Sequence, residues 1–238
     1  MEAAATAFVA VAREAIGARD RFVTALSGGS TPRALFELLA TERFASSVDW
    51  ARVHVCWGDE RAVPPDHPDS NFGAAAASLL RKLAIPDEHI HRMQGELPDV
   101  EEAAARYQAD LARVFGVPGD GLPPIFDLVL LGMGADGHTA SLFPYSQPLT
   151  ERRRWVVGHQ VARLGKARIT LTPPILNRAA EVRLLVTGAD KAGVLKEVLL
   201  GPRDPERLPV QLVAPEAARL VWLLDRAAGA EVPADRAS

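Results

Sequence analysis

The sequence predicts an α/β fold, with one doubly wound, Rossmann-like domain whose mostly parallel sheet carries helices on both faces. Two observations lead to this prediction. Short continuous apolar runs, such as residues 128–131, are typical of strands that are buried on both faces. These runs alternate with helical segments along the whole chain, as in parallel sheets with crossover helices. Neither a repeat nor a linker divides the sequence, so we expect one domain over residues 1–238 with a loose tail at 230–238.

The individual elements follow from apolar periodicity and from helix-capping residues. The periodicity is clearest over residues 99–115, where one helical face is apolar. We expect Thr31 to cap one helix, with Pro32 at its first helical position. We expect Ser70 or Asp69 to cap a second helix and Asp190 a third. The expected helices cover 1–16, 33–40, 70–82, 99–115 and 191–199, with helical turns from 173 and from 225; the expected strands cover 22–26, 53–57, 128–131, 155–157, 168–172, 182–186 and 220–224.

The composition narrows the classes of function. With 238 residues and 48% hydrophobic residues, the chain can bury a substantial core. A net charge of -3 argues against a nucleic-acid partner, and no apolar run is long enough to span a membrane. The single cysteine, Cys56, lies in an apolar run and fits a reducing compartment. We therefore expect a cytoplasmic protein that is a monomer, although the sequence leaves an oligomer open.

A glycine-rich loop follows the run at 128–131, and it allows two interpretations. Residues 132–137 match the G-x-G-x-x-G pattern of dinucleotide-binding loops. That pattern requires a full helix next and an acidic residue at the end of the following strand. Here Pro144 interrupts the helix within two turns, and the next strand ends in Gly158 and His159. We therefore expect no nicotinamide cofactor.

The second interpretation makes His138 the working residue of this loop. Ligands bind at the carboxyl ends of parallel strands, and imidazole titrates near pH 6.5, which suits a general base. Asp136, two residues earlier, can orient the ring. A buried histidine satisfied by the glycine loop remains the alternative at this point. Ser141 lacks the G-x-S-x-G context of a serine hydrolase, so we expect it to have a helix-start or packing role.

A second glycine loop, Ser27-Gly28-Gly29-Ser30-Thr31, joins an expected strand to an expected helix. Free N–H groups and the helix dipole favour an anion at such a helix start. The G-K-[ST] signature of a nucleotide-binding P-loop is absent, and an ordinary tight turn is the competing interpretation. Lys191 lies in the first turn of a later helix, where a cation is unfavourable unless an anionic ligand binds beside it.

Two further polar segments have simple interpretations. Asp59, Glu60 and Arg61 directly follow the strand at 53–57, and alone they indicate a solvated loop. His89 and His91 form an H-x-H pair without a cysteine or carboxylate at metal-ligand spacing, so we interpret them as surface histidines and expect no metal site.

Four parts of the chain together resemble a known family. They are LSGGSTPRALFELLA (26–40), WGDERAVPPDHPDSNFG (57–73), DLVLLGMGADGHTASLFP (127–144), and RITLT (168–172) with TGADKAGVL (187–195). Their order and spacing resemble the 6-phosphogluconolactonases, which share a superfamily with glucosamine-6-phosphate isomerase/deaminase. The resemblance implies a small phosphorylated sugar lactone as substrate, 6-phospho-D-glucono-1,5-lactone, and 6-phospho-D-gluconate as product. It implies no cofactor and no metal.

The resemblance also implies roles for the residues singled out above. His138, Asp136 and Arg61 would be catalytic; Ser27, Gly28, Gly29, Ser30, Thr31, Arg168 and Lys191 would hold the phosphate; Asp59, Glu60, Gly134 and Gly137 would complete the pocket. The isomerase/deaminases typically carry an aromatic residue after the D-E pair and a further carboxylate after D-G-H, whereas this chain has Arg61 and then residues 139–143 without an acid. A non-catalytic sugar-phosphate sensor is the remaining alternative, and the intact His138 argues against it.

Overall fold

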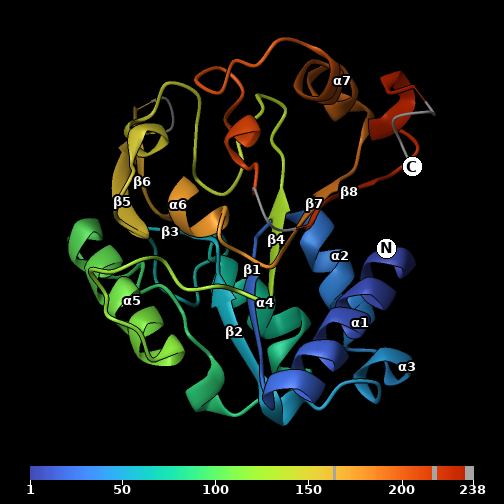
Figure 1. The fold of residues 1–238 in the computed structure, drawn as a ribbon, viewed down its shortest axis with the longest axis vertical. Helices are drawn as coiled ribbons and strands as arrows, with labels where there is room; N and C mark the ends of the chain where they lie inside the picture. The colour runs from blue at the N-terminus through green and yellow to red at the C-terminus, as the bar shows by residue number, and fades with distance from the viewer. Residues whose placement is uncertain (163–164, 216–218, 234–238) are drawn as a thin grey trace.

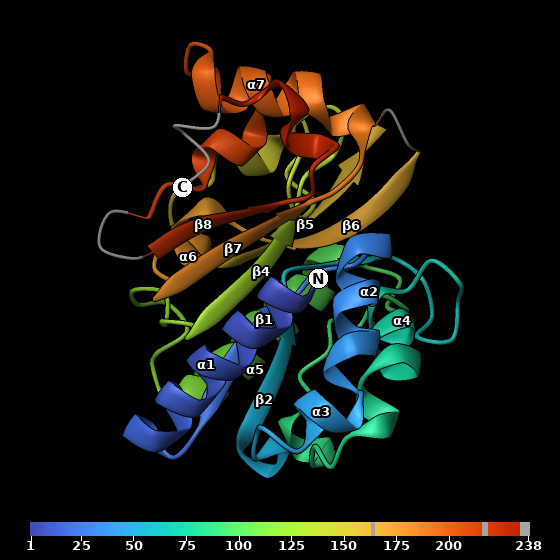
Figure 2. The same ribbon diagram turned by 90° about the vertical axis from the view of Figure 1, so that its right-hand side faces the viewer.

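The protein contains two sheets of different kinds (Figures 1 and 2). The structure is a computed structural model, and it describes residues 1–162, 165–215 and 219–233. The larger sheet is parallel, in the order β2-β1-β4-β7-β8. Its strands are β1 (Phe22–Leu26), β2 (Val53–Trp57), β4 (Leu128–Gly132), β7 (Glu181–Val186) and β8 (Arg219–Leu224). The predicted α/β fold with a mostly parallel sheet is confirmed.

The smaller sheet is antiparallel, in the order β3-β6-β5, and the sequence did not predict it as a separate sheet. It consists of β3 (Asp59–Arg61), β5 (Val156–Val161) and β6 (Lys166–Leu171). The prediction of a solvated loop at 59–61 is wrong, because these residues pair with β6 in a register that sets Arg61 opposite Arg168. The three charged residues 59–61 have no alternating apolar pattern that would predict a strand, and their extended conformation depends on pairing with β6.

The helices cover both faces of the parallel sheet. Figure 1 shows α1 and α2 on one side and α5 and α6 on the other. The helices are α1 (Glu2–Arg19), α2 (Ser30–Leu39), α3 (Glu42–Ala45), α4 (Asn71–Ser78), α5 (Val100–Phe115), α6 (Pro173–Leu176) and α7 (Ala192–Leu200). Among the described residues, no helix has both the length and the apolar character needed to cross a bilayer.

The caps test the predicted helix starts. Ser70 caps α4 as predicted, since its hydroxyl accepts a hydrogen bond from the Gly73 N–H at 3.0 Å. Thr31 does not cap α2, because the helix begins one residue earlier and Gly29 is its N-cap. Asp190 does not cap α7 either; it lies in a 3₁₀ segment, Ala189–Lys191, ahead of that helix. The expected loose tail at 230–238 starts inside another 3₁₀ segment, Ala228–Glu231, and residues 234–238 lie outside the described part.

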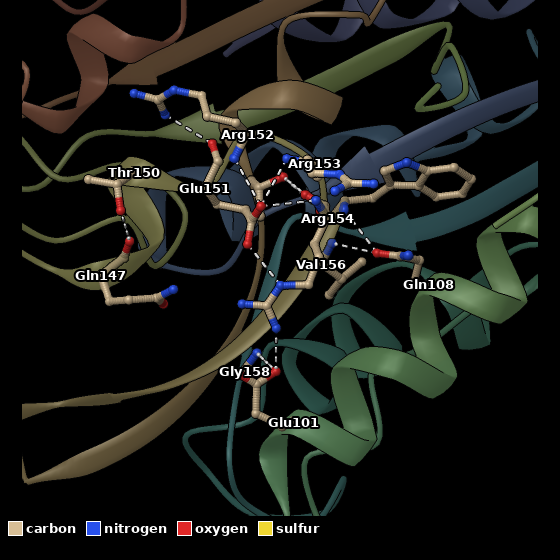
Figure 3. Close-up of polar contacts among 12 residues, drawn as sticks. Glu101, Gln108, Gln147, Thr150, Glu151, Arg152, Arg153, Arg154, Val156 and Gly158 are labelled. Carbon is tan, nitrogen blue, oxygen red and sulfur yellow. Dashed lines mark hydrogen bonds and ion pairs between the residues drawn. The ribbon is translucent and has the colours of Figure 1, made fainter. Parts of the chain in front are cut away.

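The small sheet is anchored to α5 at the start of β5 (Figure 3). Glu151 accepts hydrogen bonds from the backbone N–H groups of the next three residues and from Arg154 Nε. Arg154 Nη1 in turn reaches Glu101 on α5 at 3.0 Å. Further along β5, a Cβ atom on Gly158 would lie 2.3 Å from the Val100 carbonyl oxygen, so α5 packs directly against the strand backbone. These contacts fix the position of the strands that carry part of the site.

The core lies between the parallel sheet and its helices. Cys56 on β2 is fully buried there, as predicted, and burial raises the pKa of its thiol well above the usual range. An inert packing role follows, because the thiolate is the reactive form.

Candidate active site

A cavity of about 510 Å³ lies beyond the carboxyl ends of β1, β4 and β7, where the small sheet meets the parallel one. Parallel α/β sheets bind ligands at this edge. Most of the predicted site residues line it: Ser27, Gly28, Gly29, Ser30, Thr31, Asp59, Arg61, Gly134, His138, Arg168 and Lys191. Loops that are far apart in the sequence therefore converge on one space.

His138 and Asp136 form a hydrogen-bonded pair beside this cavity. The Asp136 carboxylate lies against His138 Nδ1 and also accepts the His138 backbone N–H at 3.2 Å. Because Nδ1 is held by the carboxylate, Nε2 is the ring nitrogen left to act on a ligand or a water. The ring of Phe143 packs on the other side of the imidazole, with ring centroids 4.5 Å apart. The imidazole is thus fixed in orientation at the cavity edge.

Two glycines make this geometry attainable. A Cβ atom on Gly134 would lie 2.0 Å from His138 Nδ1, so only glycine leaves room for the ring beside its carboxylate. Gly137 has a φ of 77°, which L side chains rarely adopt, and it packs against Leu208. Gly137 was predicted to line the pocket; it instead shapes the turn behind it.

The second glycine loop presents the start of α2 to the cavity. Gly29, with a φ of 106°, is the N-cap of this helix, so the N–H groups of its first turn lack intrahelical partners. The Ser27 hydroxyl is buried with no partner among the described residues. Thr31 Oγ1 lies 2.6 Å from Thr187 Oγ1 in the loop after β7. Unpaired donors around a helix N-terminus form a binding site for an anion.

Arg61 and Arg168 bring two positive charges to the cavity. Arg61 Nη1 donates to the Asp69 carbonyl at 2.5 Å, while its Nε is buried without a partner in the described chain. Arg168 is 8% exposed. Its pKa is lowered, first by burial and then by the neighbouring Arg61 charge. Two adjacent, partly desolvated guanidinium groups favour an anionic group between them.

Lys191 lies at the cavity but is already paired. Its ammonium contacts the Asp190 carboxylate at 2.6 Å, and Lys191 is the N-cap of α7, not part of its first turn. Asp190 therefore supplies the negative charge that we expected from an anionic ligand, and the position of Lys191 alone does not require such a ligand. Lys191 still lines the cavity together with the start of α2.

Glu60 was predicted to line the pocket and lies elsewhere. It is 2% exposed, and its two oxygens accept the backbone N–H groups of Arg61, Asn71 and Phe72, each at 2.8 Å. Burial raises its pKa, and these hydrogen bonds oppose the shift. Glu60 therefore holds the N-terminus of α4 against β3, behind the Arg61 side chain.

Sequence reasoning missed Asn71 as a site residue. Its side chain donates to the Asp59 carbonyl at 2.9 Å and lies so close to Gly28 that a Cβ there would be 1.7 Å from Asn71 Oδ1. The sequence signalled only a helix start at this point. Its contact with the first glycine loop arises from tertiary packing.

The histidine pair at 89 and 91 also needs correction. His91 is 4% exposed, not a surface residue, and its two ring nitrogens contact Asp110 Oδ2 and His54 Nδ1, each at 3.1 Å. The ring of His54 packs at a tilt against His89, with centroids 3.8 Å apart, and the pKa of His54 falls to about 4 because of burial and the neighbouring histidines. In the described part of the chain, no group of three or more potential ligands is placed to bind a metal ion.

The fold and the cavity together define an α/β protein in which the start of a helix and the histidine of a histidine–carboxylate pair line one cavity. The chain belongs to the family of glucosamine-6-phosphate isomerases/6-phosphogluconolactonase, whose model matches residues 1–222. This membership confirms the resemblance seen in the sequence.

Individual relatives agree with the family match. The chain is 43% identical over 217 residues to a 6-phosphogluconolactonase from Synechocystis, covering 91% of this chain and 87% of the relative. It is 42% identical over 215 residues to a human 6-phosphogluconolactonase, covering 89% and 81%. The solved structure of 6-phosphogluconolactonase from Trypanosoma cruzi superposes with a TM-score of 0.85 at 30% identity, covering 97% of this chain and 92% of that one.

Proposed function

We propose that this protein hydrolyses 6-phospho-D-glucono-1,5-lactone to 6-phospho-D-gluconate, the step that follows glucose-6-phosphate oxidation in the pentose phosphate pathway. One observation carries the proposal: the His138–Asp136 pair shares a cavity with the α2 N-terminus and with two arginines. A lactone that carries a phosphate presents a carbonyl at one end and an anion at the other. The carbonyl suits the histidine–carboxylate pair, and the anion suits the α2 N-terminus. The names of the relatives support the same activity.

The chemistry requires a base and a stabiliser for negative charge. His138 Nε2 takes a proton from water as the water oxygen bonds to the lactone carbonyl carbon. Arg61 stabilises the oxyanion that forms, and Asp136 holds the imidazolium. The bond between this carbon and the ring oxygen then breaks. The ring oxygen leaves as a hydroxyl with the proton from His138. The carboxylic acid that remains loses its proton to solvent, so the product is released as a carboxylate.

The phosphate anchors the substrate at the other end of the cavity. The α2 N-terminus and the hydroxyls of Ser27, Ser30 and Thr31 supply donors, and Arg168 and Lys191 supply positive charge. Binding at the phosphate positions the distant carbonyl against the water held by His138, so a bimolecular attack becomes intramolecular in effect. An ester carbonyl is already electrophilic, and this chemistry needs neither a metal nor an organic cofactor.

The proposal extends to the setting of the enzyme. We propose a single cytoplasmic domain that acts as a monomer. The single, buried Cys56 supports a reducing compartment. The shared cavity between the two sheets supports one domain, because neither sheet holds the complete site.

The test compares two substrates in one experiment. Freshly prepared phosphogluconolactone and glucosamine-6-phosphate are each incubated with the protein, with acid release followed for the first and ammonia release for the second. We expect lactone hydrolysis far above the buffer rate and no ammonia. Ammonia release would instead identify an isomerase/deaminase. Binding of either compound without turnover would identify a sensor.

A further inference from the structure

The proposed site depends on two sheets that must keep a fixed relative position. His138 follows β4 of the parallel sheet, whereas Arg61 and Arg168 belong to strands of the small antiparallel sheet. The proposed reaction needs the base on one face of the carbonyl and a guanidinium at its oxygen, within a few tenths of an ångström. A contact that joins the His138 loop to the small sheet would set this spacing.

Ser141, three residues after His138, makes that contact. Its hydroxyl donates to Asp59 Oδ2 on β3 at 2.7 Å. Its carbonyl oxygen contacts His159 Nε2 on β5 at 2.9 Å, and its N–H donates to Thr170 Oγ1 on β6 at 3.2 Å. One residue of the loop is thus bonded to all three strands of the small sheet. Ser141 is 1% exposed, so water does not compete for these bonds.

Asp59 extends the connection to the phosphate side. Its second oxygen, Oδ1, accepts from Asn71 Nδ2 at 3.2 Å, and the Asn71 side chain lies against Gly28. Asp59 is 7% exposed and immediately precedes Glu60 and Arg61 on β3. The carboxylate therefore joins the His138 loop, the arginine strand and the first glycine loop.

We propose that Ser141 is a positioning residue. Through its hydrogen bond to Asp59 it holds His138 at a fixed position relative to Arg61 and Arg168. This inference rests on the proposed function. It gives Ser141 a role beyond packing, because its hydroxyl donates to a carboxylate of the strand that carries Arg61. Ser141 is not the nucleophile in this scheme; its buried hydroxyl donates to Asp59 while water attacks.

The role predicts a particular kinetic signature. Among the described residues, Ser141 makes no hydrogen bond to the α2 N-terminus, to Arg168 or to Lys191, so the phosphate donors keep their places when its hydroxyl is removed. Misplacement of a reacting group by about 1 Å can lower the rate about 100-fold. We therefore expect Ser141→Ala to lower kcat roughly 10- to 100-fold and to change KM by less than about threefold.

Ser78→Ala is the matched control. Ser78 is also a buried serine, 4% exposed, and its hydroxyl donates to the Ala74 carbonyl at 2.7 Å within α4, away from the cavity lining. Loss of this neutral bond should lower stability less than loss of the Ser141 bond to a buried carboxylate, and it should leave kcat within about twofold of wild type. A purely structural role for Ser141 would give the same kinetics as this control.

The experiment measures kcat and KM for the lactone with wild type, Ser78→Ala, Ser141→Ala, Asp59→Asn and the double variant. If the two residues act through one bond, the double variant should be no slower than the slower single variant. Ser141→Cys, whose thiol fills the same space and donates weakly, should give an intermediate kcat and serves if the alanine variant does not fold.

The outcomes separate this inference from the proposed function. Wild-type kcat in Ser141→Ala, or in Ser141→Cys where the alanine variant is unfolded, would overturn the positioning role alone. A loss of kcat in the double variant equal to the product of the losses in the two single variants would also overturn it. Complete inactivity of a folded Ser141→Ala variant would make the serine a nucleophile and overturn it as well. A wild-type protein that does not hydrolyse the lactone would overturn the proposed function and this inference with it.

Discussion

Gly134→Ala should separate catalysis from folding in this protein. The added Cβ would lie 2.0 Å from His138 Nδ1, 2.2 Å from Cε1 and 2.6 Å from Asp136 Oδ1, all far inside van der Waals contact. The backbone at Gly134 does not have a positive φ, so alanine can adopt it. The imidazole is the end of a rotatable side chain and can move away at small cost. The methyl group therefore displaces His138 from its carboxylate while the fold remains.

The expected magnitude follows from the loss of the oriented base. General-base catalysis contributes about 10²- to 10⁴-fold, or roughly 3–5 kcal/mol of barrier. We expect kcat for the lactone to fall by about this factor, to the level of a His138→Ala variant, while the free energy of unfolding changes by less than about 1 kcal/mol. Acid release from fresh lactone, corrected for buffer hydrolysis, measures kcat, and urea unfolding measures stability.

Gly17→Ala is the control for this experiment. Gly17 lies in α1, and a Cβ there would meet nothing within 4 Å. Alanine in a helix interior should stabilise the protein by about 0.5–1 kcal/mol and leave kcat unchanged. A Gly134→Ala variant with wild-type kcat would refute the assignment of the His138–Asp136 pair, because the base cannot keep its position beside a methyl group at 2.0 Å.

Three further predictions test binding, packing and pH dependence. Lys191→Ala should raise KM about 10-fold with little change in kcat. The control Lys196→Ala, within α7 and paired with Glu231, should change neither constant. An effect of Lys191→Ala on kcat alone would contradict phosphate binding. Gly158→Ala should lower the free energy of unfolding by about 1–3 kcal/mol and lower Tm by several degrees in a thermal scan, because its Cβ would lie 2.3 Å from the Val100 carbonyl oxygen. An unchanged Tm would mean that α5 does not pack on β5 as described. Glu151 has a pKa lowered to about 2, because hydrogen bonds from the backbone and Arg154 outweigh its burial. Ionised Glu151 should contribute on the order of 2–3 kcal/mol to the free energy of unfolding, fully above about pH 5 and less as the pH falls toward 2. In urea titrations, Glu151→Gln should therefore make the free energy of unfolding depend less on pH over this range. A pH dependence as steep as that of wild type would contradict this role for Glu151.

The parallel sheet could be predicted from the sequence because each of its strands carries its own signal. The run at 128–131 is apolar throughout, and β4 is correspondingly buried along residues Leu128–Leu131. The small sheet carries no such signal. β3 is charged at every position, and its hydrogen bonds come from β6, more than 100 residues later in the chain. Pairing between segments so far apart leaves no local pattern in the sequence.

The site divides in the same way. His138 and the Ser27–Thr31 loop could be predicted to lie at the same cavity, because a strand, a loop and a helix start are local features with known chemistry. Asn71 and Ser141 could not be assigned, since their roles depend on which atoms lie opposite them: Gly28 for one and Asp59 for the other. The buried His91 was mistaken for a surface residue for the same reason, because Asp110 and His54 supply its partners.

The carboxylates of the cavity argue for hydrolysis over isomerisation. Moving a proton between two carbons of a sugar requires an additional acid–base group near the base. Of the carboxylates that line the cavity in the described chain, Asp59 is committed to Ser141 and Asn71, and Asp190 is paired with Lys191. The position packed on His138 is Phe143, an apolar ring. What remains at the reacting end is one oriented base, His138, and the Arg61 guanidinium, a set suited to adding water to a carbonyl and stabilising the oxyanion.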